Sequence, residues 1–528
     1  MKNKYSYGGG QNPRKVNPLF KDIKEYNKYL LSLIGIFVLL LSGIISYNYT
    51  NTSYAKWSSS VESKNTIKVY VKSNLDESGA NAPELTSNMI PVYYDNTSDS
   101  WKKADAKNSK EQYKWYDYNN KMWANAVTVT STNRETYLKA DVGAEISMND
   151  INTMWVWIPR YTYTYLNTNT PEEIKIKFEI GTNSSGTIKC TDAVNGTSTT
   201  SETCIDSTNG SLKVGTSTYT HPAFWWDKND DNIRTEGEEL TGIWIGKFEN
   251  SATKIPTSST STTESEIIIK PIVQSARNKS ISYQFRDIRQ MEKASNIYGF
   301  AQSNSTTFNW DGSLTGDTNN IDTHMMKNME WGAVAYLSHS KYGRCTNGIC
   351  EEITINNCSS NITGIGADTV SANQTTTTCS ISKNKYNGES GMKASTTRNI
   401  YGIYDMNGGT VEYVMGNMTN SSGQFYSSSA GFNIAPQSKY YDSYTYDNLG
   451  DTTYTRGKLG DATKEMAPTD EMGNWYSDYA SFLYSNRSWF MRGGNSATGV
   501  NSGIFSFTYC EGYSGSAFTS RSVLNVLD

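Results

Sequence analysis

The sequence predicts an α+β protein in which many short strands and two helices support long polar loops. Short segments such as 66–72, TIKVYVK, alternate apolar and polar residues as a half-buried strand does. Two segments, 283–296 and 324–340, have the apolar spacing and the length of helices. Stretches rich in Ser, Thr, Asn and Gly separate the ordered segments and are typical of loops on a scaffold: 181–220, 251–266 and 345–398.

At the N-terminus the sequence predicts a cytoplasmic basic tail, 1–28, followed by a transmembrane helix, 29–47. Residues 30–46 carry no charge, and basic residues outnumber acidic ones before them, which places the N-terminus inside the cell. The alternative is a cleaved signal peptide, with Ser53-Tyr54-Ala55 as a poor cleavage site. The expected location is the cell membrane, single-pass, with the C-terminal domain extracellular.

Beyond the apolar run, the sequence predicts a stalk and two folded regions. Residues 48–65 are polar and predict the stalk. Residues 66–145 predict a small β-rich region, because the strand-like runs MIPVYYD and WANAVTVT follow the first strand. The larger domain is expected over 150–528, with the low-complexity stretches as insertions.

Composition limits the class of partner. The net charge is −4, from 48 basic and 52 acidic residues, which argues against a nucleic-acid-binding protein. Aromatic residues make up 12% of the chain, which argues against a disordered protein. We therefore expect an unknown protein or carbohydrate as ligand and no nucleic acid.

Seven cysteines in an exported chain predict disulfides with one thiol left over. Cys190 and Cys204 bracket a Ser/Thr/Gly-rich stretch, and a bridge between them would stabilise the fold by roughly 3 kcal/mol. Cys510 stands alone. No C-x-x-C pair occurs, which argues against a zinc site. Four cysteines lie in one insertion and their pairing stays open: Cys345, Cys350, Cys358 and Cys379.

The acidic segment 227–238, DKNDDNIRTEGE, is a candidate calcium loop. Four oxygen donors fall at calcium-loop spacing: Asp227, Asn229, Asp231 and Glu238. Asn232 stands where such a loop needs glycine, and no helix pattern flanks the segment. The alternative is a solvated acidic loop. No cofactor other than calcium is expected.

Four segments in order resemble the formylglycine-generating-enzyme or sulfatase-modifying-factor family: TGIWIGKFENS (241–251), HMMKNMEWGAVAYL (324–337), NIYGIYDMNGGTVEYVMGN (399–417) and FMRGGN (490–495). The resemblance implies a C-type-lectin-like fold whose long loops carry a binding face. Enzymes of that family act through a pair of closely spaced C-terminal cysteines that bind copper, whereas Cys510 is the single cysteine in this region. The resemblance therefore implies a binder. Asp405 and Glu412 in the third segment are expected to satisfy buried backbone or Arg492 and not a ligand.

The C-terminal segment between about 495 and 520 is the predicted ligand-binding face. Gly503, Ile504, Phe505 and Phe507 have the character of fixed scaffold. Ten other positions carry mainly the polar, small or Tyr residues that adaptable binding surfaces use: Asn495, Ser496, Thr498, Asn501, Thr508, Tyr509, Cys510, Tyr513, Ser514 and Ser516. The segment resembles the variable region of diversity-generating-retroelement target proteins, in which mutagenesis of Asn codons yields such residues. The alternative is an ordinary surface loop.

Together these features predict a membrane-anchored, extracellular, adhesin-like or receptor-like binding protein that is not an enzyme. Neither a phosphate loop nor a G-x-S-x-G elbow occurs in the sequence. Two alternatives stay open. One is an enzyme on the same scaffold that acts on an exported protein or glycan, with acidic or His side chains in mutual reach in a deep pocket. The other is a structural surface or phage-associated protein.

Overall fold

The computed structural model describes most of the chain from residue 75 onward and two short strands before it. The chain divides into two units, 1–71 and 72–528. In the first unit, β1 (Tyr54–Trp57) pairs antiparallel with β2 (Ile67–Tyr70). The described residues are 54–57, 67–70, 75–164, 170–186, 218–231, 237–256, 264–293, 296–300, 309–313, 320–356, 385–466, 474–484, 486–496 and 498–527.

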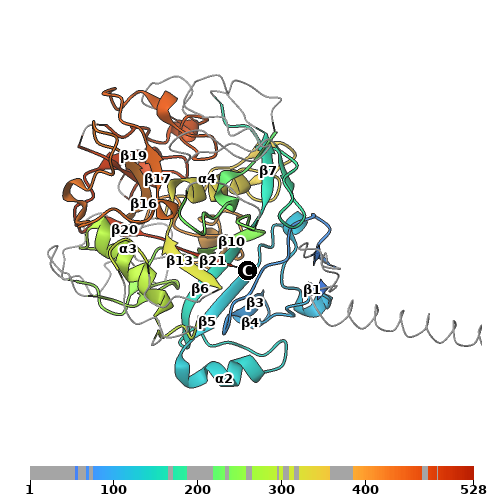
Figure 1. Ribbon diagram of the computed structural model, residues 1–528. Coiled ribbons are helices and arrows are strands. Elements are labelled where there is room, and N and C mark those ends of the chain that lie inside the picture. The colour runs from blue at the N-terminus through green and yellow to red at the C-terminus, as the bar shows by residue number, and fades with distance from the viewer. Residues whose placement is uncertain are drawn as a thin grey trace, which may run out of the picture. The chain divides into compact units, whose positions relative to one another are not determined.

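A seven-stranded sheet forms the centre of the second unit (Figure 1). Each neighbouring pair in it is antiparallel. In order across the sheet, the strands are β13 (Ile321–Met325), β21 (Ser522–Val526), β10 (Gly242–Gly246), β6 (Ile151–Pro159), β5 (Asn125–Val129), β3 (Ile90–Asp95) and β4 (Ser100–Lys103). The predicted boundary at 145–150 therefore falls between two strands, β5 and β6, that pair with each other.

A five-stranded sheet carries the C-terminal segment. The long strand β16 pairs antiparallel with β18, and β18 pairs antiparallel with β19 at the edge. β17 and β20 each run parallel to β16. The bounds are β16 (Val411–Met418), β17 (Asp442–Tyr444), β18 (Trp489–Arg492), β19 (Phe507–Cys510) and β20 (Phe518–Ser520).

The remaining strands and turns are short. A three-stranded sheet joins β7 (Tyr161–Thr164), β8 (Ile176–Phe178) and β9 (Thr218–Thr220). Two hairpins pair β11 (Ser251–Ala252) with β12 (Ile267–Ile268) and β14 (Cys345–Thr346) with β15 (Ile349–Cys350). The 3-10 turns are η1 (Glu111–Tyr113), η2 (Tyr118–Asn120), η4 (Pro222–Phe224), η5 (Gln290–Glu292), η6 (Ser428–Ala430), η7 (Ser438–Tyr440), η8 (Tyr454–Arg456), η9 (Trp475–Ser477) and η10 (Gly499–Asn501).

Helices are few and short in the part that the structure describes. They are α2 (Ser131–Lys139), α3 (Ile281–Arg289), α4 (Asn328–Ser338) and α5 (Glu389–Met392). The helices predicted within 283–296 and 324–340 are confirmed as α3 and α4, although residues 321–325 form a strand. The predicted α+β class is corrected, because strands and irregular segments dominate and the described part is β-rich.

The predicted membrane location also needs correction. Over the described ranges, none of the helices combines the length and apolar character that crossing a membrane requires. The longest of them, α4, has 11 residues, far fewer than the about 20 needed to span a bilayer. The segment 29–47 and most of the stalk 48–65 lie outside the described residues.

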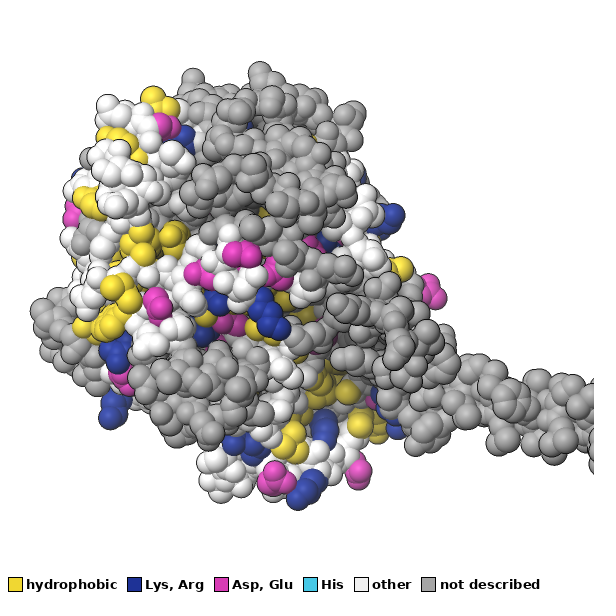
Figure 2. All heavy atoms as spheres, viewed as in Figure 1, with side chains coloured by type: hydrophobic (Ala, Val, Ile, Leu, Met, Phe, Trp, Pro, Cys, Tyr) yellow, Lys and Arg dark blue, Asp and Glu magenta, His cyan; other side chains and the backbone are white. Residues whose placement is uncertain are grey.

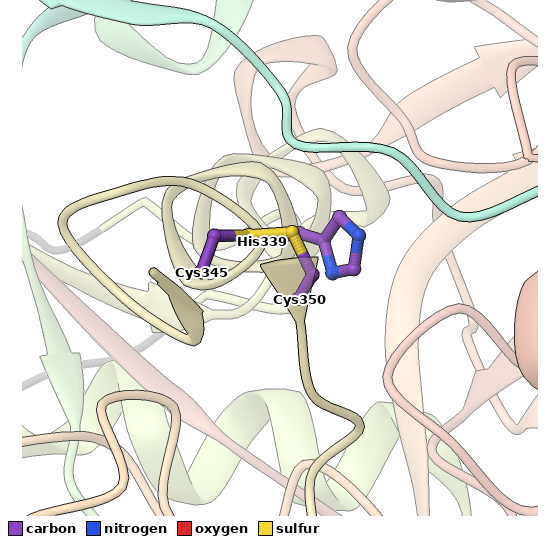
Figure 3. A group of neighbouring side chains, drawn as sticks. All are labelled: His339, Cys345 and Cys350. Atoms are coloured by element: carbon purple, nitrogen blue, oxygen red, sulfur yellow. A yellow bond between two sulfur atoms is a disulfide. The ribbon is translucent and has the colours of Figure 1, made fainter. Parts of the chain in front are cut away.

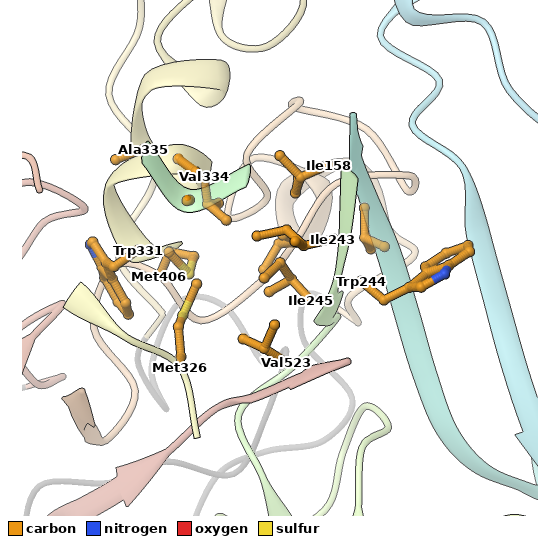
Figure 4. Packing of buried hydrophobic residues seen from close by; sticks show 14 of the residues in the cluster. Ile158, Ile243, Trp244, Ile245, Met326, Trp331, Val334, Ala335, Met406 and Val523 are labelled. Atoms are coloured by element: carbon orange, nitrogen blue, oxygen red, sulfur yellow. The ribbon is translucent and has the colours of Figure 1, made fainter. Parts of the chain in front are cut away.

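Helix α4 packs on the central sheet, and every one of its residues is buried. Figure 4 shows Val334 of the helix facing Ile243 and Ile245 of β10, with Trp331 beyond Met406 on the far side. Each such side chain stabilises the fold by about 1.5–3 kcal/mol when fully buried. The indole Nε1 of Trp331 also donates to the carbonyl of Ile504 at 2.7 Å. The helix therefore connects the sheet to the C-terminal segment.

The charged residues in the motif-like segments are buried and paired within the protein. Glu412 accepts from Arg521 Nε at 3.0 Å, so its partner is Arg521 and not Arg492. Asp405 Oδ2 accepts from the backbone amide of Glu249 at 3.2 Å, which is the backbone role expected for it. Buried charges that are paired in this way belong to the scaffold.

Candidate functional site

The C-terminal segment separates into buried and exposed positions. The four residues predicted as scaffold, Gly503, Ile504, Phe505 and Phe507, are all buried. The candidate ligand-binding residues are partly or fully exposed, with the exception of Cys510. The exposed candidates are Asn495, Ser496, Thr498, Asn501, Thr508, Tyr509, Tyr513, Ser514 and Ser516.

Packing against the segment 474–482 explains why the scaffold positions are fixed. The amide of Phe505 donates to Asp478 Oδ2 at 2.9 Å. Gly503 leaves room for the same carboxylate, since a Cβ there would lie 1.9 Å from Asp478 Oδ1. Phe507 packs edge-to-face on Tyr454, with ring centroids 5.4 Å apart. These contacts fix the backbone from which the exposed side chains project.

The exposed candidates form two groups and not one continuous face. Residues 495–501 lie in the connection between β18 and β19, where Thr498 Oγ1 donates to the carbonyl of Asn495 at 2.7 Å. The second group consists of Thr508 and Tyr509 within β19 and of residues 511–516, which follow the other end of the strand. A four-residue strand spans about 10 Å, so the two groups sit at opposite ends of this hairpin.

Around the second group, three side chains form a stacked cluster. Arg487 Nη1 donates to the Tyr509 hydroxyl at 2.9 Å, and its guanidinium lies 4.9 Å from the Tyr509 ring centroid. Tyr484 packs edge-to-face on Tyr509, with centroids 4.8 Å apart. Tyr513 and Glu511 are close enough to Arg487 to interact electrostatically with it. We call these five residues, Tyr484, Arg487, Tyr509, Glu511 and Tyr513, the Tyr509 face.

Two tyrosines of the Tyr509 face, Tyr484 and Tyr513, have a raised pKa. Hydrogen bonding with Tyr509, followed by burial, raises the pKa of Tyr484. Burial, followed by the neighbouring Cys510, raises the pKa of Tyr513, whose residue is 46% exposed. The face therefore offers neutral hydroxyls, aromatic rings and one guanidinium, which suit hydrogen bonding and stacking with a ligand.

Three members of the Tyr509 face were not among the predicted site residues: Tyr484, Arg487 and Glu511. Tyr484 and Arg487 form a tight turn in which each backbone amide donates to the other residue's carbonyl, at 2.9 and 3.2 Å. The sequence contains one indication of this turn: Ser485 and Asn486, whose residue types favour turns, stand between an aromatic and a basic residue. Its proximity to Tyr509 depends on sheet pairing that the sequence does not show.

Cys510 lies beneath the Tyr509 face and not on it. Its thiol is free, and the residue is only 6% exposed. The hydroxyl of Tyr413 lies 3.0 Å from the Cys510 sulfur and 3.0 Å from the carbonyl oxygen of Tyr513. Cys510 therefore differs from the other nine predicted ligand-binding residues in that its side chain is buried.

The candidate calcium loop uses its oxygens internally. Asp227 Oδ1 accepts from the amide of Asp231 at 3.0 Å, and Glu238 Oε1 accepts from the amide of Lys228 at 3.2 Å. Asn229 donates to Asp231 at 2.9 Å. Residues 232–236 lie outside the described part. Over the described His, Cys, Asp and Glu side chains, the group that converges closely enough for a metal ion lies elsewhere. Calcium binding by this loop stays a prediction.

A small surface hollow lies at the N-terminal end of α4. Asp442 in its wall accepts from the amide of Met329 at 2.6 Å and so caps the helix. Two lysines and two aspartates contribute to the wall, so it does not favour one sign of charge. The lining residues are Pro222, Ala223, Trp225, Asp227, Lys327, Met329, Ser438, Lys439 and Asp442.

The structure defines one cysteine pairing that the sequence left open. Cys345 and Cys350 are bonded to each other across the β14–β15 hairpin. The other cysteines of that insertion, Cys358 and Cys379, and the suggested pair Cys190 and Cys204 lie outside the described residues.

No protein-family model and no curated protein matches the chain. Among solved structures, "Treponema denticola variable protein 1" is 14% identical in sequence, and the match covers 57% of this chain and 90% of that chain with a TM-score of 0.22. A likeness this weak carries no argument about this chain. The comparisons do not support the resemblance to the formylglycine-generating family.

Proposed function

We propose that this chain is a ligand-binding protein whose recognition surface is the Tyr509 face. The observation that carries the proposal is the division of the C-terminal segment into a buried, tightly packed framework and an exposed set of Tyr, Ser, Thr and Asn side chains. Tyr and Arg are enriched where binding energy is concentrated, and small polar residues adapt around them.

The stacked cluster of Tyr484, Arg487 and Tyr509 is suited to recognition because it is already ordered. A guanidinium held by one hydroxyl and two rings loses little side-chain entropy when a ligand arrives. The ligand class is a protein or a carbohydrate. Charges of both signs are interspersed on the molecular face in Figure 2, in keeping with the near-neutral chain and with a partner that is not nucleic acid.

A finer part of the proposal is that the exposed positions are diversified while the framework is constant. Substitution at exposed sites such as Tyr513 and Ser516 removes few packing contacts, so variation there is tolerated. Variation at Cys510 is restricted by its contact with Tyr413.

Sequencing the gene from many isolates, or through one growing population, tests the diversification. We expect substitutions to concentrate at Thr508, Tyr509, Tyr513, Ser514 and Ser516, with Gly503, Phe505 and Phe507 unchanged. Changes scattered evenly over exposed residues of the whole chain would contradict it.

A binding screen tests the recognition surface itself. The purified protein is applied to arrays of glycans and of proteins, beside a variant with Tyr509→Ala and Tyr513→Ala. We expect the double variant to lose at least about tenfold in affinity, because truncated hot-spot residues cost more than 1 kcal/mol. The control is Tyr446→Ala, which follows β17 at the opposite edge of the same sheet. Equal binding by all three proteins would refute the assignment.

A further inference from the structure

We infer that His339, Cys345 and Cys350 form a redox-gated site for zinc, which becomes available when the Cys345–Cys350 disulfide is reduced. Figure 3 shows the imidazole of His339 beside the disulfide. The two sulfurs and a ring nitrogen of His339 all lie within 4.8 Å of one another. Among the described side chains this is the one group of its kind. The β14–β15 hairpin that carries the cysteines is a separate sheet from the one that carries Tyr509.

The hairpin that carries the two cysteines holds them in register without help from the disulfide. Cys345 is directly opposite Cys350, and Thr346 is opposite Ile349. The turn between them is Asn347-Gly348, with φ of 54° and 81°. These are the residues and the left-handed conformations of a two-residue hairpin turn. The two sulfurs therefore stay neighbours when the bond between them opens.

Side chains from outside the hairpin hold the backbone of both cysteines. Lys121 Nζ donates to the carbonyl of Cys345 at 3.0 Å, and the Tyr476 hydroxyl donates to the carbonyl of Cys350 at 3.4 Å. Arg344 Nε donates to the carbonyl of Glu351 at 3.2 Å, just after the second strand. None of these contacts involves sulfur, so reduction leaves them in place.

His339 has a ring nitrogen without a partner. The residue is 3% exposed, and no described atom forms a hydrogen bond with its Nε2. Three aromatic rings surround the imidazole, with centroids 5.1 Å away for Trp475, 5.6 Å for Tyr476 and 5.4 Å for Phe505. Aromatic packing therefore holds the imidazole in its place beside the two sulfurs, and no hydrogen bond at Nε2 has to be broken for the ring to bind a metal ion.

A dithiol is the reductant that opens the Cys345–Cys350 disulfide. The dithiol gives two electrons and two protons, the bond between the two sulfurs breaks, and the dithiol becomes a cyclic disulfide. Zinc then displaces the two thiol protons to solvent and binds two thiolates and the imidazole. Cys350 is partly exposed, so the dithiol has access to its sulfur. Two thiolates neutralise the charge of the ion, and the fourth tetrahedral position is left for water.

The first test uses cobalt as a spectroscopic probe of the whole protein. The protein is reduced with dithiothreitol, freed of it under an inert atmosphere and titrated with Co²⁺. We expect thiolate-to-cobalt absorption with the band pattern of a tetrahedral site, displaced by Zn²⁺, and no such absorption from the oxidised protein. A Cys345→Ser, Cys350→Ser double variant loses the absorption, whereas Cys510→Ser keeps it. His339→Phe, which suits the aromatic surroundings, weakens Co²⁺ binding by at least about tenfold.

The second test needs no variant and so does not depend on the folding of one. The reduced wild-type protein is alkylated with and without Zn²⁺, and each cysteine is followed by peptide mass spectrometry. We expect Zn²⁺ to protect Cys345 and Cys350 by at least about tenfold, with the protection removed by a chelator. Equal alkylation with and without Zn²⁺ would overturn the inference, as would cobalt absorption that survives in the double-serine variant or an unchanged affinity in His339→Phe.

Discussion

The carboxyl group of Glu465 is buried beside two tyrosine hydroxyls, and its pKa is well above the usual value. It accepts from Tyr163 at 3.1 Å, from the amide of Gly460 at 3.2 Å and from the Tyr336 hydroxyl. Burial, followed by the nearby charge of Asp461, raises the pKa of Glu465 to about 8. The folded protein therefore holds a proton at Glu465 over a range where the unfolded chain has lost it.

We expect Glu465→Gln to flatten the pH dependence of stability. A carboxyl whose folded pKa is raised binds more protons in the folded state between about pH 4.5 and 8. The free energy of unfolding of the wild type should therefore fall as pH rises through that window, by up to about 1.4 kcal/mol per pH unit for this one group. Urea unfolding at several pH values measures it. Parallel profiles for wild type and variant would contradict the assignment.

The buried position of Cys510 makes a second prediction at this scale. In the oxidised, folded protein the thiol should react with iodoacetamide at least about a hundredfold more slowly than in urea, because local opening must come first. Peptide mass spectrometry of timed samples gives both rates. Fast labelling of Cys510 in the native protein would contradict this prediction, because it would show that the side chain lies on the surface.

Sequence reasoning found the character of most site residues but not their partners. Side chains such as Thr498 and Tyr513 are exposed, and Phe505 and Phe507 are buried, as the residue types indicated. The burial of Cys510 was not foreseen, because nothing in a linear pattern shows that Tyr413 lies against it. Such contacts join residues about a hundred positions apart and arise only when the sheet forms.

At the scale of elements, the β18–β19 connection depends on a glycine at the site of closest approach. We expect Gly503→Ala to cost about 1–3 kcal/mol in free energy of unfolding, because its Cβ would meet the buried carboxylate of Asp478. The matched control is Gly450→Ala, where nothing lies within 4 Å of the added Cβ and the change should stay within about 0.5 kcal/mol. Chemical denaturation compares the two. Similar losses from both substitutions would show that Asp478 does not limit this loop.

Elements with a clear local period were predicted well, and those defined by tertiary contacts were not. α4 was found from its apolar run. The last two residues of strand β13, His324 and Met325, were included in the predicted helix because they continue the same spacing. In the structure His324 lies between Asp322 and Glu330, with ring nitrogens 2.8 Å from each carboxylate. That arrangement fixes the strand and is invisible in a local pattern.

At the scale of the second unit, the strands between residues 90 and 129 belong to the same sheet as later strands. β5 and β3 continue the sheet from β6, and Trp115 stacks on Trp244 of β10 with ring centroids 6.4 Å apart. We therefore expect a fragment of residues 150–528 to lose cooperative unfolding and to expose apolar surface, whereas a fragment of 75–528 keeps both properties of the full chain. Circular dichroism during urea unfolding, together with dye binding, tests this. Two fragments with the same sharp transition would show that residues 75–149 form an independent unit.

The place of β21 in the central sheet has a consequence for how the chain is made. β21 lies between β13 and β10, yet it leaves the ribosome after both of them. Until residue 526 has emerged, the strands on either side expose unpaired backbone, which is a template for aggregation. Closure of the sheet must then join segments far apart in sequence, which is slow. A premature stop shortly before Ser522 would therefore remove an interior strand of the sheet rather than a tail.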